Sequence, residues 1–287
     1  MIILERLQSL ISLRGNEAIY IGGIPDLSKL GEIRNNNKGT PMKIIAYRNN
    51  NDIDIQFQDE FYYIKEHQTY SNFSTGSVKN PYDRTVFGVG YVGAGKYRTK
   101  ENNRFTIYYQ QWKNMLLRCY VKEERHRAYE DVKVCEEWLN FQNFAKWYDE
   151  HYYEVNERLQ IDKDIKYPGN TIYSPQTCIL TPQRINLMFM NKSNNRGLPN
   201  GIIKQGNSYI AKYNHENLGV YPTIEEAYYN QTKKKKEVII QLANEYKEIM
   251  PKYVYDIIVS YEFDIRNDKN YVAWNTEKIT LLCEKWR

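Results

Sequence analysis

The clearest fold signal in this chain is the stretch Leu218-Gly219-Val220-Tyr221-Pro222-Thr223-Ile224-Glu225-Glu226-Ala227. Its second half is a capping box, in which the Thr223 hydroxyl and the Glu226 side chain each accept a hydrogen bond from the other residue's backbone amide. This pattern predicts a helix that begins after Thr223 and runs to about Glu248, because a proline follows shortly afterwards. Two short strands are predicted just upstream, at 208–213 and 217–220. The sequence therefore predicts a small sheet followed by one long helix.

Toward the N-terminus, the hydrophobic period changes from helical to strand-like. Alternating residues predict strands at Lys43–Tyr47 and Ile53–Phe57, with a third extended segment at Phe61–Glu66. The segment Asn35–Gly39 is predicted to be a hinge, since asparagine and glycine runs favour turns and loops. Residues 1–14 carry apolar side chains at helical spacing, which predicts a short amphipathic helix.

The middle third mixes both periods, and the fold class predicted for the chain is α+β with several modules. We expect a strand at Phe105–Tyr109, helices at Trp112–Tyr120 and Glu136–Glu150, and a helix start at Thr181-Pro182, with threonine as the cap. The expected modules are an N-terminal helix and linker (1–40), a small β module (41–97), a central α/β unit (98–195), a sheet with a long helix (196–250) and a C-terminal helical or extended tail (251–287).

The composition is that of a globular protein, with 41% hydrophobic and 26% charged residues. No apolar stretch is long enough for a transmembrane helix, and the N-terminus lacks the pattern of a secretory signal, so a cytoplasmic protein is expected. The four cysteines are dispersed without a CxxC pair, which predicts buried free thiols and no structural metal site. The net charge of +5, from 40 basic and 35 acidic residues, allows local nucleic-acid contacts without requiring them.

Two glycine patterns match phosphate-binding motifs only in spelling. The segment Gly88–Gly93 has the spacing of a dinucleotide fingerprint, but no helix is expected directly behind it. Lys96 is followed by Tyr97, where a P-loop needs Ser or Thr to hold magnesium. The glycines are therefore interpreted as positions where two strands approach closely. The run Lys233–Lys236 falls within the long helix and is either a solvated face or a phosphate-contacting patch.

Three segments near the C-terminus form a further pattern: Gly201-Ile202, Tyr209–Ala211 and Leu218–Ala227. Together they resemble an AP2-type domain. The resemblance implies a three-stranded sheet packed on a helix, a fold whose sheet typically reads DNA in the major groove. The expected sheet lacks the arginine and tryptophan positions that usually make base contacts, and its remaining basic residues are Lys204 and Lys212.

The middle third carries another pattern. Its residues are Trp112-x-x-Met115-x-x-Arg118-Cys119-Tyr120, Val134-Cys135-Glu136-Glu137-Trp138-x-x-Phe141-x-x-Phe144, Ile161-Asp162-Lys163-Asp164-Ile165, Tyr173-Ser174-Pro175-x-x-Cys178 and Pro182-x-x-Ile185-Asn186. This pattern is similar to the HNH-type proteins of phages and prophages that often precede an AP2-like unit. Residues 52–97 resemble an N-terminal β module of the same proteins. The resemblance implies a phage-encoded protein that acts in the cytoplasm of an infected bacterial host.

HNH chemistry needs a histidine general base beside a metal ion that activates water. Where the resemblance places that histidine, this chain has Asp162-Lys163-Asp164, and Asn170 and Asn186 occupy the following motif positions. His151 would have to approach from a helix end to act as the base. The resemblance thus implies Asp162, Asp164, His151, Asn170 and Asn186 as catalytic candidates, and Mg²⁺ is expected as a cofactor only if this site is active.

The leading functional expectation is a non-catalytic protein with an HNH/AP2-like scaffold that acts at DNA or at DNA-handling machinery. Phosphate contacts would come from basic residues near the expected sheets, and such contacts make binding weaken steeply with salt. These residues are Lys96, Arg98, Lys100, Arg104, Lys192, Arg196, Lys204 and Lys212.

Two alternatives remain open. The first is a phage counter-defence inhibitor that binds a host antiphage nuclease complex, for example of the Gabija type, and blocks its access to DNA. The 27 tyrosines and 5 tryptophans favour this alternative, because aromatic residues are enriched at protein interfaces. The unmatched ends of the chain could add surfaces for a homo-oligomer. The second alternative is an HNH-type homing endonuclease.

Overall fold

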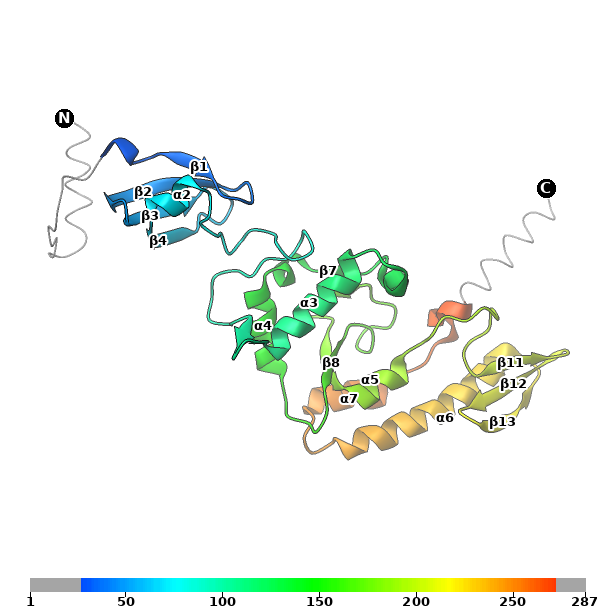
Figure 1. Cartoon of the computed structure of the whole chain (residues 1–287). Helices are drawn as coiled ribbons and strands as arrows, with labels where there is room; N and C mark the ends of the chain where they lie inside the picture. The colour runs from blue at the N-terminus through cyan, green and yellow to red at the C-terminus, as the bar shows by residue number, and fades with distance from the viewer. Residues whose placement is uncertain (1–26, 272–287) are drawn as a thin grey trace, which may run out of the picture. The chain divides into compact units, whose positions relative to one another are not determined.

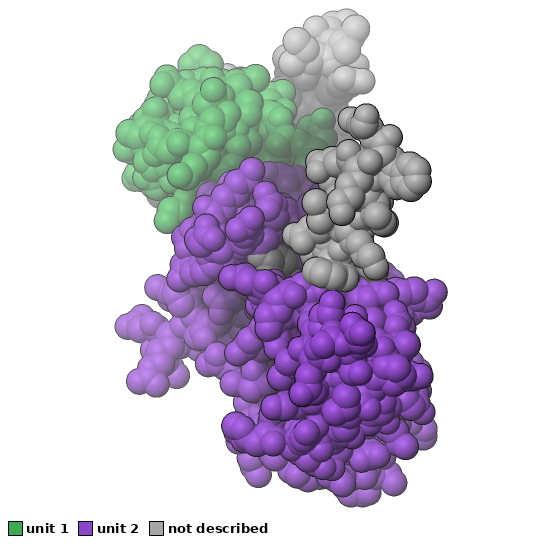
Figure 2. Space-filling view, turned by 90° about the vertical axis from the view of Figure 1, so that its right-hand side faces the viewer, with its two compact units in different colours: residues 1–83 green, residues 84–287 purple. Residues whose placement is uncertain are grey.

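The described chain contains helices and runs of mostly antiparallel strands, so the α+β fold class predicted from the sequence is confirmed. The computed structural model describes residues 27–271 (Figure 1). The helix predicted for residues 1–14 lies outside these residues. The chain divides into two compact units, Met1–Asp83 and Arg84–Arg287 (Figure 2).

The first unit is built on an antiparallel sheet in the order β1 (Ile33–Asn35), β2 (Pro41–Asn49), β3 (Asp52–Phe57) and β4 (Ile64–Gln68). The strands predicted from alternation are present, with the third one shifted a few residues toward the C-terminus. Period-two spacing makes one sheet face apolar, because Ile53, Ile55 and Phe57 are all fully buried. The short helix α2 (Tyr70–Ser74) covers this face with Phe73. The added strand and helix supply the core that a lone hairpin lacks.

The segment Asn35–Gly39 was predicted to be a hinge and is instead a fixed turn between β1 and β2. Asn36 is 5% exposed, and its side-chain oxygen accepts hydrogen bonds from the amides of Lys38 and Thr40, both at 2.9 Å. The Asn36 side-chain amide donates to the Asp83 carboxylate at 2.8 Å. The sheet therefore starts at residue 33, before the predicted boundary at 41, and the unit ends at Asp83 rather than at residue 97.

An aromatic core between α3 (Ile107–Tyr120) and α4 (Phe141–His151) opens the second unit. Trp112, Phe141 and Phe144 are fully buried there, as helical spacing predicts for α4. The predicted helix over Glu136–Glu150 is divided, because a 3-10 turn (Glu136–Leu139) precedes the helix proper. The side chain of Asn140 caps α4 by accepting from the Gln142 amide at 2.9 Å.

The strand predicted at Phe105–Tyr109 is wrong beyond Phe105. A tight hairpin of β5 (Lys100–Glu101) and β6 (Arg104–Phe105) ends there, and α3 begins at Ile107. Tyr109 is buried with Trp112, one helical turn further on, so tertiary packing selects the helix over the strand preference of an aromatic-rich segment.

Two short strand pairs and a helix follow. β8 (Leu159–Asp162) pairs antiparallel with β10 (Ile179–Pro182), and α5 (Gln183–Phe189) follows directly. β7 (Lys133–Val134) runs parallel to β9 (Ile172–Tyr173), and a 3-10 segment (Glu124–Tyr129) precedes β7. The helix predicted to start at Thr181-Pro182 uses Pro182 as its cap residue. Thr181 belongs to β10, and its buried hydroxyl has no hydrogen-bond partner among the described residues, so threonine is not the cap.

The C-terminal sheet consists of β11 (Ile202–Gln205), β12 (Ser208–Tyr213) and β13 (Glu216–Tyr221), all antiparallel and in that order. The long helix α6 (Ile224–Glu245) comes next, as the capping box predicts. The Thr223 hydroxyl accepts from the Glu226 amide at 3.2 Å, which confirms this part of the cap.

Helix α6 contributes to two cores, and it extends from the C-terminal sheet to α5 and α7 (Figure 1). Near its start, Ile224 packs with Ile202 of the sheet, and further along, Ile239 packs with Val254 of α7 (Lys252–Ser260). Residues 252–263 therefore form part of a core rather than a separate tail, and a 3-10 turn follows at Ile265–Asn267. No helix within residues 27–271, α6 included, combines the length and apolarity needed to cross a membrane.

Candidate nucleic-acid interface

The loop Asp162–Asp164, which carries two of the catalytic candidates, leaves the end of β8. The Asp162 carboxylate accepts hydrogen bonds from the amides of Asp164 and Ile165, both at 2.7 Å. Burial raises the pKa of the Asp162 carboxyl. These contacts give Asp162 the role of a side chain that closes a turn.

Lys163 occupies the centre of this loop. It is 7% exposed, and its ammonium group donates to the Asp164 carboxylate and, at 2.8 Å, to the Asn170 carbonyl. The ammonium also lies 5.9 Å from the ring centroid of Tyr173. The Asn170 side chain donates back to the Lys163 carbonyl at 2.9 Å. A cation of the protein itself therefore holds the carboxylate that a metal ion would need.

The other two catalytic candidates have different partners. His151, at the end of α4, has its Nδ1 2.7 Å from the Trp147 carbonyl oxygen, and its ring stacks on Trp147 with centroids 4.6 Å apart. Asn186 lies in α5, and its buried side-chain oxygen has no hydrogen-bond partner among the described residues. The structure thus joins Asp162, Asp164 and Asn170 around Lys163 but leaves His151 engaged elsewhere. This set does not fit a magnesium site.

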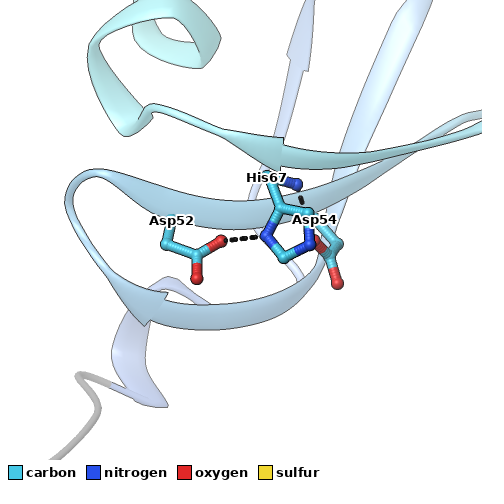
Figure 3. Close-up of side chains that lie close together, drawn as sticks. All are labelled: Asp52, Asp54 and His67. Atoms are coloured by element: carbon cyan, nitrogen blue, oxygen red, sulfur yellow. Dashed lines mark hydrogen bonds and ion pairs between the residues drawn. The ribbon is translucent and has the colours of Figure 1, made fainter. Parts of the chain in front are cut away.

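A different group of potential ligands was missed from the sequence. Asp52 and Asp54 of β3 and His67 of β4 form the one group of three such residues found within residues 27–271 (Figure 3). His67 Nδ1 lies 2.9 Å from the Asp52 carboxylate, and the His67 amide donates to Asp54 at 3.0 Å. Only the strand pairing brings His67 to the two aspartates, so spacing along the chain gave no signal.

Arg48 of β2 decides what this group does. Its guanidinium binds Asp52 through two hydrogen bonds, at 2.7 and 2.8 Å, and binds Asp54 through two more. A metal ion would have to displace this cation from both carboxylates. The cluster therefore serves as a cross-strand contact between β2, β3 and β4 rather than as a metal site.

Because of this cluster, the stability of the first unit varies with pH in the acid range. Hydrogen bonding to Arg48 lowers the pKa of Asp52 from 3.8 to about 2. The stabilisation is therefore complete above pH 3.8 and is lost as the pH falls toward about 2. We expect Arg48→Gln to destabilise the unit by about 1 kcal/mol at neutral pH, with the difference from wild type disappearing at the acid end. Urea unfolding at several pH values measures this, and a difference that stays constant down to the lowest pH would contradict it.

Four of the eight basic residues predicted to contact nucleic acid lie together around the β5–β6 hairpin. Lys96 and Arg98 precede β5, Lys100 lies on β5 and Arg104 lies on β6. All four side chains are exposed. The turn residues Asn102 and Asn103 have φ values of 48° and 60°. Positive φ at both central residues is what a tight type I′ hairpin turn requires, so the hairpin has a fixed geometry. Within the described chain, none of the eight basic side chains forms an ion pair.

Aromatic rings lie between the cations of this hairpin. The Lys100 ammonium lies 4.9 Å from the Phe105 ring centroid. The ammonium of Lys113, which belongs to α3, lies 5.5 Å from the same centroid. Lys113 also lies 6.0 Å from the Phe87 ring centroid. The sequence did not reveal Lys113, because its approach depends on α3 starting at Ile107. We call Arg98, Lys100, Arg104, Phe105 and Lys113 the hairpin surface.

The other four predicted contact residues do not gather in this way. Lys192 and Arg196 lie in the connection from α5 to β11. Lys204 lies directly opposite Tyr209 in the strand register. Tyr209 packs on the α6 side of the sheet, and residues that lie opposite each other share a face, so Lys204 is on that side too. Lys212 follows the buried Ala211 and points to the opposite face.

The outer face of the C-terminal sheet, where the AP2 resemblance implies base reading, carries a row of apolar side chains beside Lys212. Ile203, Ile210 and Val220 lie directly opposite one another across the three strands. Ile203 is 36% exposed and Val220 is 56% exposed. We call these three residues the outer sheet row. Apolar branched side chains cannot bind phosphate or pair with base edges through hydrogen bonds.

The run Lys233–Lys236 is largely engaged within the protein. Lys234 forms an ion pair with Glu216 at 3.2 Å, and Lys236 pairs with Glu262. Burial lowers the pKa of Lys235, whose ammonium lies 4.8 Å from the Phe263 ring centroid. Of the two interpretations, these contacts favour the solvated helix face over the phosphate-contacting patch.

The glycine segment forms two isolated β-bridges, Val86 with Gly90 and Tyr91 with Asn140, so extended backbones do approach closely there, and it also packs against helices. A Cβ atom on Gly90 would lie 2.4 Å from Leu116 Cδ1 and 2.9 Å from the Trp112 ring, both in α3. At Gly93, with φ of 71°, it would lie 2.3 Å from the Asn140 side chain that caps α4. These glycines let the backbone lie directly on the helices.

Three cysteines lie within the described chain and are free thiols: Cys119, Cys135 and Cys178. Cys178 is 3% exposed, and burial raises its pKa to about 12. Burial likewise raises the pKa of the half-buried Cys119 to about 11. The prediction of a buried free thiol is confirmed for Cys178, while Cys283 lies outside the described residues.

Comparison with known proteins identifies no relative. No protein-family model, no curated protein and no solved structure matches the chain.

Proposed function

We propose that this chain is a nucleic-acid-binding protein that does not cleave its target, built on an HNH/AP2-like scaffold and encoded by a phage. It would act in the cytoplasm of the infected host, at DNA or DNA-handling machinery. The observation that carries the proposal is the hairpin surface, where cations without carboxylate partners gather on a rigid turn. Such cations are available for phosphates.

The loop around Lys163 supports the non-cleaving part of the proposal. Hydrolysis of a phosphodiester by an HNH-type site needs a base and a metal ion held by carboxylates or imidazoles. In this loop the Lys163 ammonium binds Asp164, and Asp162 accepts two backbone amides. His151, the candidate for the base, is held by the Trp147 carbonyl and ring.

Fluorescence anisotropy with labelled DNA at several salt concentrations tests the binding part. In the hairpin variant, Lys96, Arg98, Lys100 and Arg104 are all changed to Ser. This variant should bind at least about tenfold more weakly, and its salt dependence should be shallower by about three released counterions. The matched control changes Lys192, Arg196, Lys204 and Lys212 to Ser, which removes the same charge. It should change affinity by less than about threefold. Equal losses in both variants, or no binding by wild type at low salt, would count against the proposal.

A plasmid assay tests the non-cleaving part. Supercoiled plasmid should remain intact with Mg²⁺ or Mn²⁺ across a range of pH. Nicking that disappears in Asp162→Ala and Asp164→Ala would overturn this part and favour the homing endonuclease.

A second candidate function is the counter-defence inhibitor, and the outer sheet row favours it. Ile203 and Val220 are exposed on either side of the half-buried Ile210, and such an apolar row suits an apolar patch of another protein. The partner would be a host antiphage nuclease complex, for example of the Gabija type, and binding would keep DNA from that complex.

The same variants separate the two functions. With a purified Gabija-type complex, wild-type protein should inhibit DNA cleavage, and Val220→Glu should relieve the inhibition, whereas Val220→Thr and the hairpin variant should retain it. Inhibition that is unaffected by Val220→Glu would remove the outer sheet row from consideration. Light scattering of the free protein shows whether it also forms a homo-oligomer.

A further inference from the structure

We infer that the hairpin surface binds a single strand of nucleic acid, with an unpaired base stacked on Phe105 and the neighbouring phosphates held by Arg98, Lys100 and Lys113. This inference rests on the proposed function and specifies its ligand. None of these aromatic contacts is needed for duplex binding through phosphates alone.

Charged groups and aromatic rings alternate along the hairpin surface. The order is Lys100, Phe105, Lys113, Phe87, with ammonium-to-centroid distances of 4.9, 5.5 and 6.0 Å. A single strand presents phosphates and base faces in a similar alternation. Surfaces that bind single strands combine a basic track with aromatic side chains on which bases stack.

The aromatic ring of Phe105 is exposed to solvent. Phe105 is 41% exposed, and the adjacent Ile107 is 43% exposed. Exposing such side chains to water is unfavourable, whereas phosphate contacts do not need them. In a duplex, base faces are hidden in the stack, so an exposed ring among cations can stack on a base only where that base is unstacked, as bases in a single strand are.

Backbone and side-chain hydrogen bonds pre-organise the hairpin surface. The Thr106 amide donates to the Thr99 carbonyl at 3.1 Å, and the Thr106 hydroxyl donates to the Arg98 carbonyl at 3.0 Å. These bonds fix Arg98 and Phe105 relative to the start of α3. A shallow open hollow of about 510 Å³ lies beside them, lined by Glu101, Asn102 and residues 104–108. The hollow gives a stacked base room beside the ring.

Anisotropy with labelled oligothymidylate, oligouridylate and a duplex, each of about 20 nucleotides, tests the inference. Wild type should bind one of the single strands at least about tenfold more tightly than the duplex. Phe105→Ala should weaken single-strand binding about tenfold without changing its salt dependence, and should leave duplex binding within about twofold. Phe105→Trp should retain wild-type affinity. The ratio between the two single strands shows whether DNA or RNA is preferred.

Tyr229→Ala is the matched control, because Tyr229 is 65% exposed but lies on α6 away from this cluster of cations. It should leave all three affinities unchanged. Equal weakening of duplex and single strand by Phe105→Ala would overturn the stacking role. Duplex binding that is tighter than single-strand binding, and is lost in the hairpin variant, would overturn this inference while leaving the proposed function intact. Absence of binding to every probe would overturn both. Unchanged circular dichroism and urea midpoints establish that each variant is folded.

Discussion

Replacement of Trp112 by alanine is expected to destabilise the second unit by about 4 kcal/mol, the largest effect that we predict for one substitution. Trp112 is fully buried, and its ring lies 5.5 Å from that of Phe141 and 5.7 Å from that of Tyr109, between centroids. Its indole N–H donates to the Trp138 carbonyl at 2.6 Å. Truncation removes the transfer free energy of the indole, leaves a cavity, and leaves a buried carbonyl without its donor.

Urea unfolding followed by circular dichroism measures this effect. Tyr229→Ala serves as the control, since it removes an aromatic ring that is 65% exposed and should change the free energy of unfolding by less than about 0.5 kcal/mol. Hydrogen exchange of the β2–β4 sheet reports on the first unit and should be the same in both variants. A loss below about 1.5 kcal/mol for Trp112→Ala would mean that the aromatic core is not closely packed.

Replacement of Lys163 by methionine is expected to cost about 2 kcal/mol of stability. Methionine retains most of the stem but removes the ammonium from the Asp164 carboxylate and from the Asn170 carbonyl. The carbonyl then lacks a donor in a region where Lys163 itself is 7% exposed, and the loop loses its central contact.

Lys166→Met is the matched control for Lys163→Met. The Lys166 ammonium also donates to a backbone carbonyl, that of Gln176, but this contact is exposed, so water can replace it. We expect a loss below about 0.5 kcal/mol. If Lys163→Met is equally mild, the Lys163 ammonium does not hold the loop, and the structural argument against a metal at Asp164 is weakened.

Local signals in the sequence predicted those elements whose cause is itself local. The capping box fixed the start of α6, and period-two alternation located β2 and β3. Tyr109 shows where this fails. Its neighbourhood is rich in aromatic residues that favour strands, yet contact with Trp112 and Phe141 makes the segment helical. Asn36 likewise reads as a flexible loop until Asp83, distant in the sequence, binds it.

The same distinction applies to the candidate site. The basic residues of the hairpin were predicted because they lie near the expected sheets. The role of Lys163 could not be predicted, since it depends on burial and on the Asn170 carbonyl, and the role of Arg48 depends on the pairing of β2 with β3. The outer sheet row depends on strand register, and a shift of one residue would exchange the two faces.

The two cores joined by α6 impose a geometric condition on its middle section. An α-helix turns by about 100° and advances by about 1.5 Å for each residue. The number of residues between Ala227, beneath the sheet, and Ile239, against α5 and α7, therefore sets the direction in which the outer sheet row points relative to the Lys163 loop. The lysines in between can change in chemical character without altering that direction, but adding or deleting a single one would swing the row about a quarter turn around the helix axis.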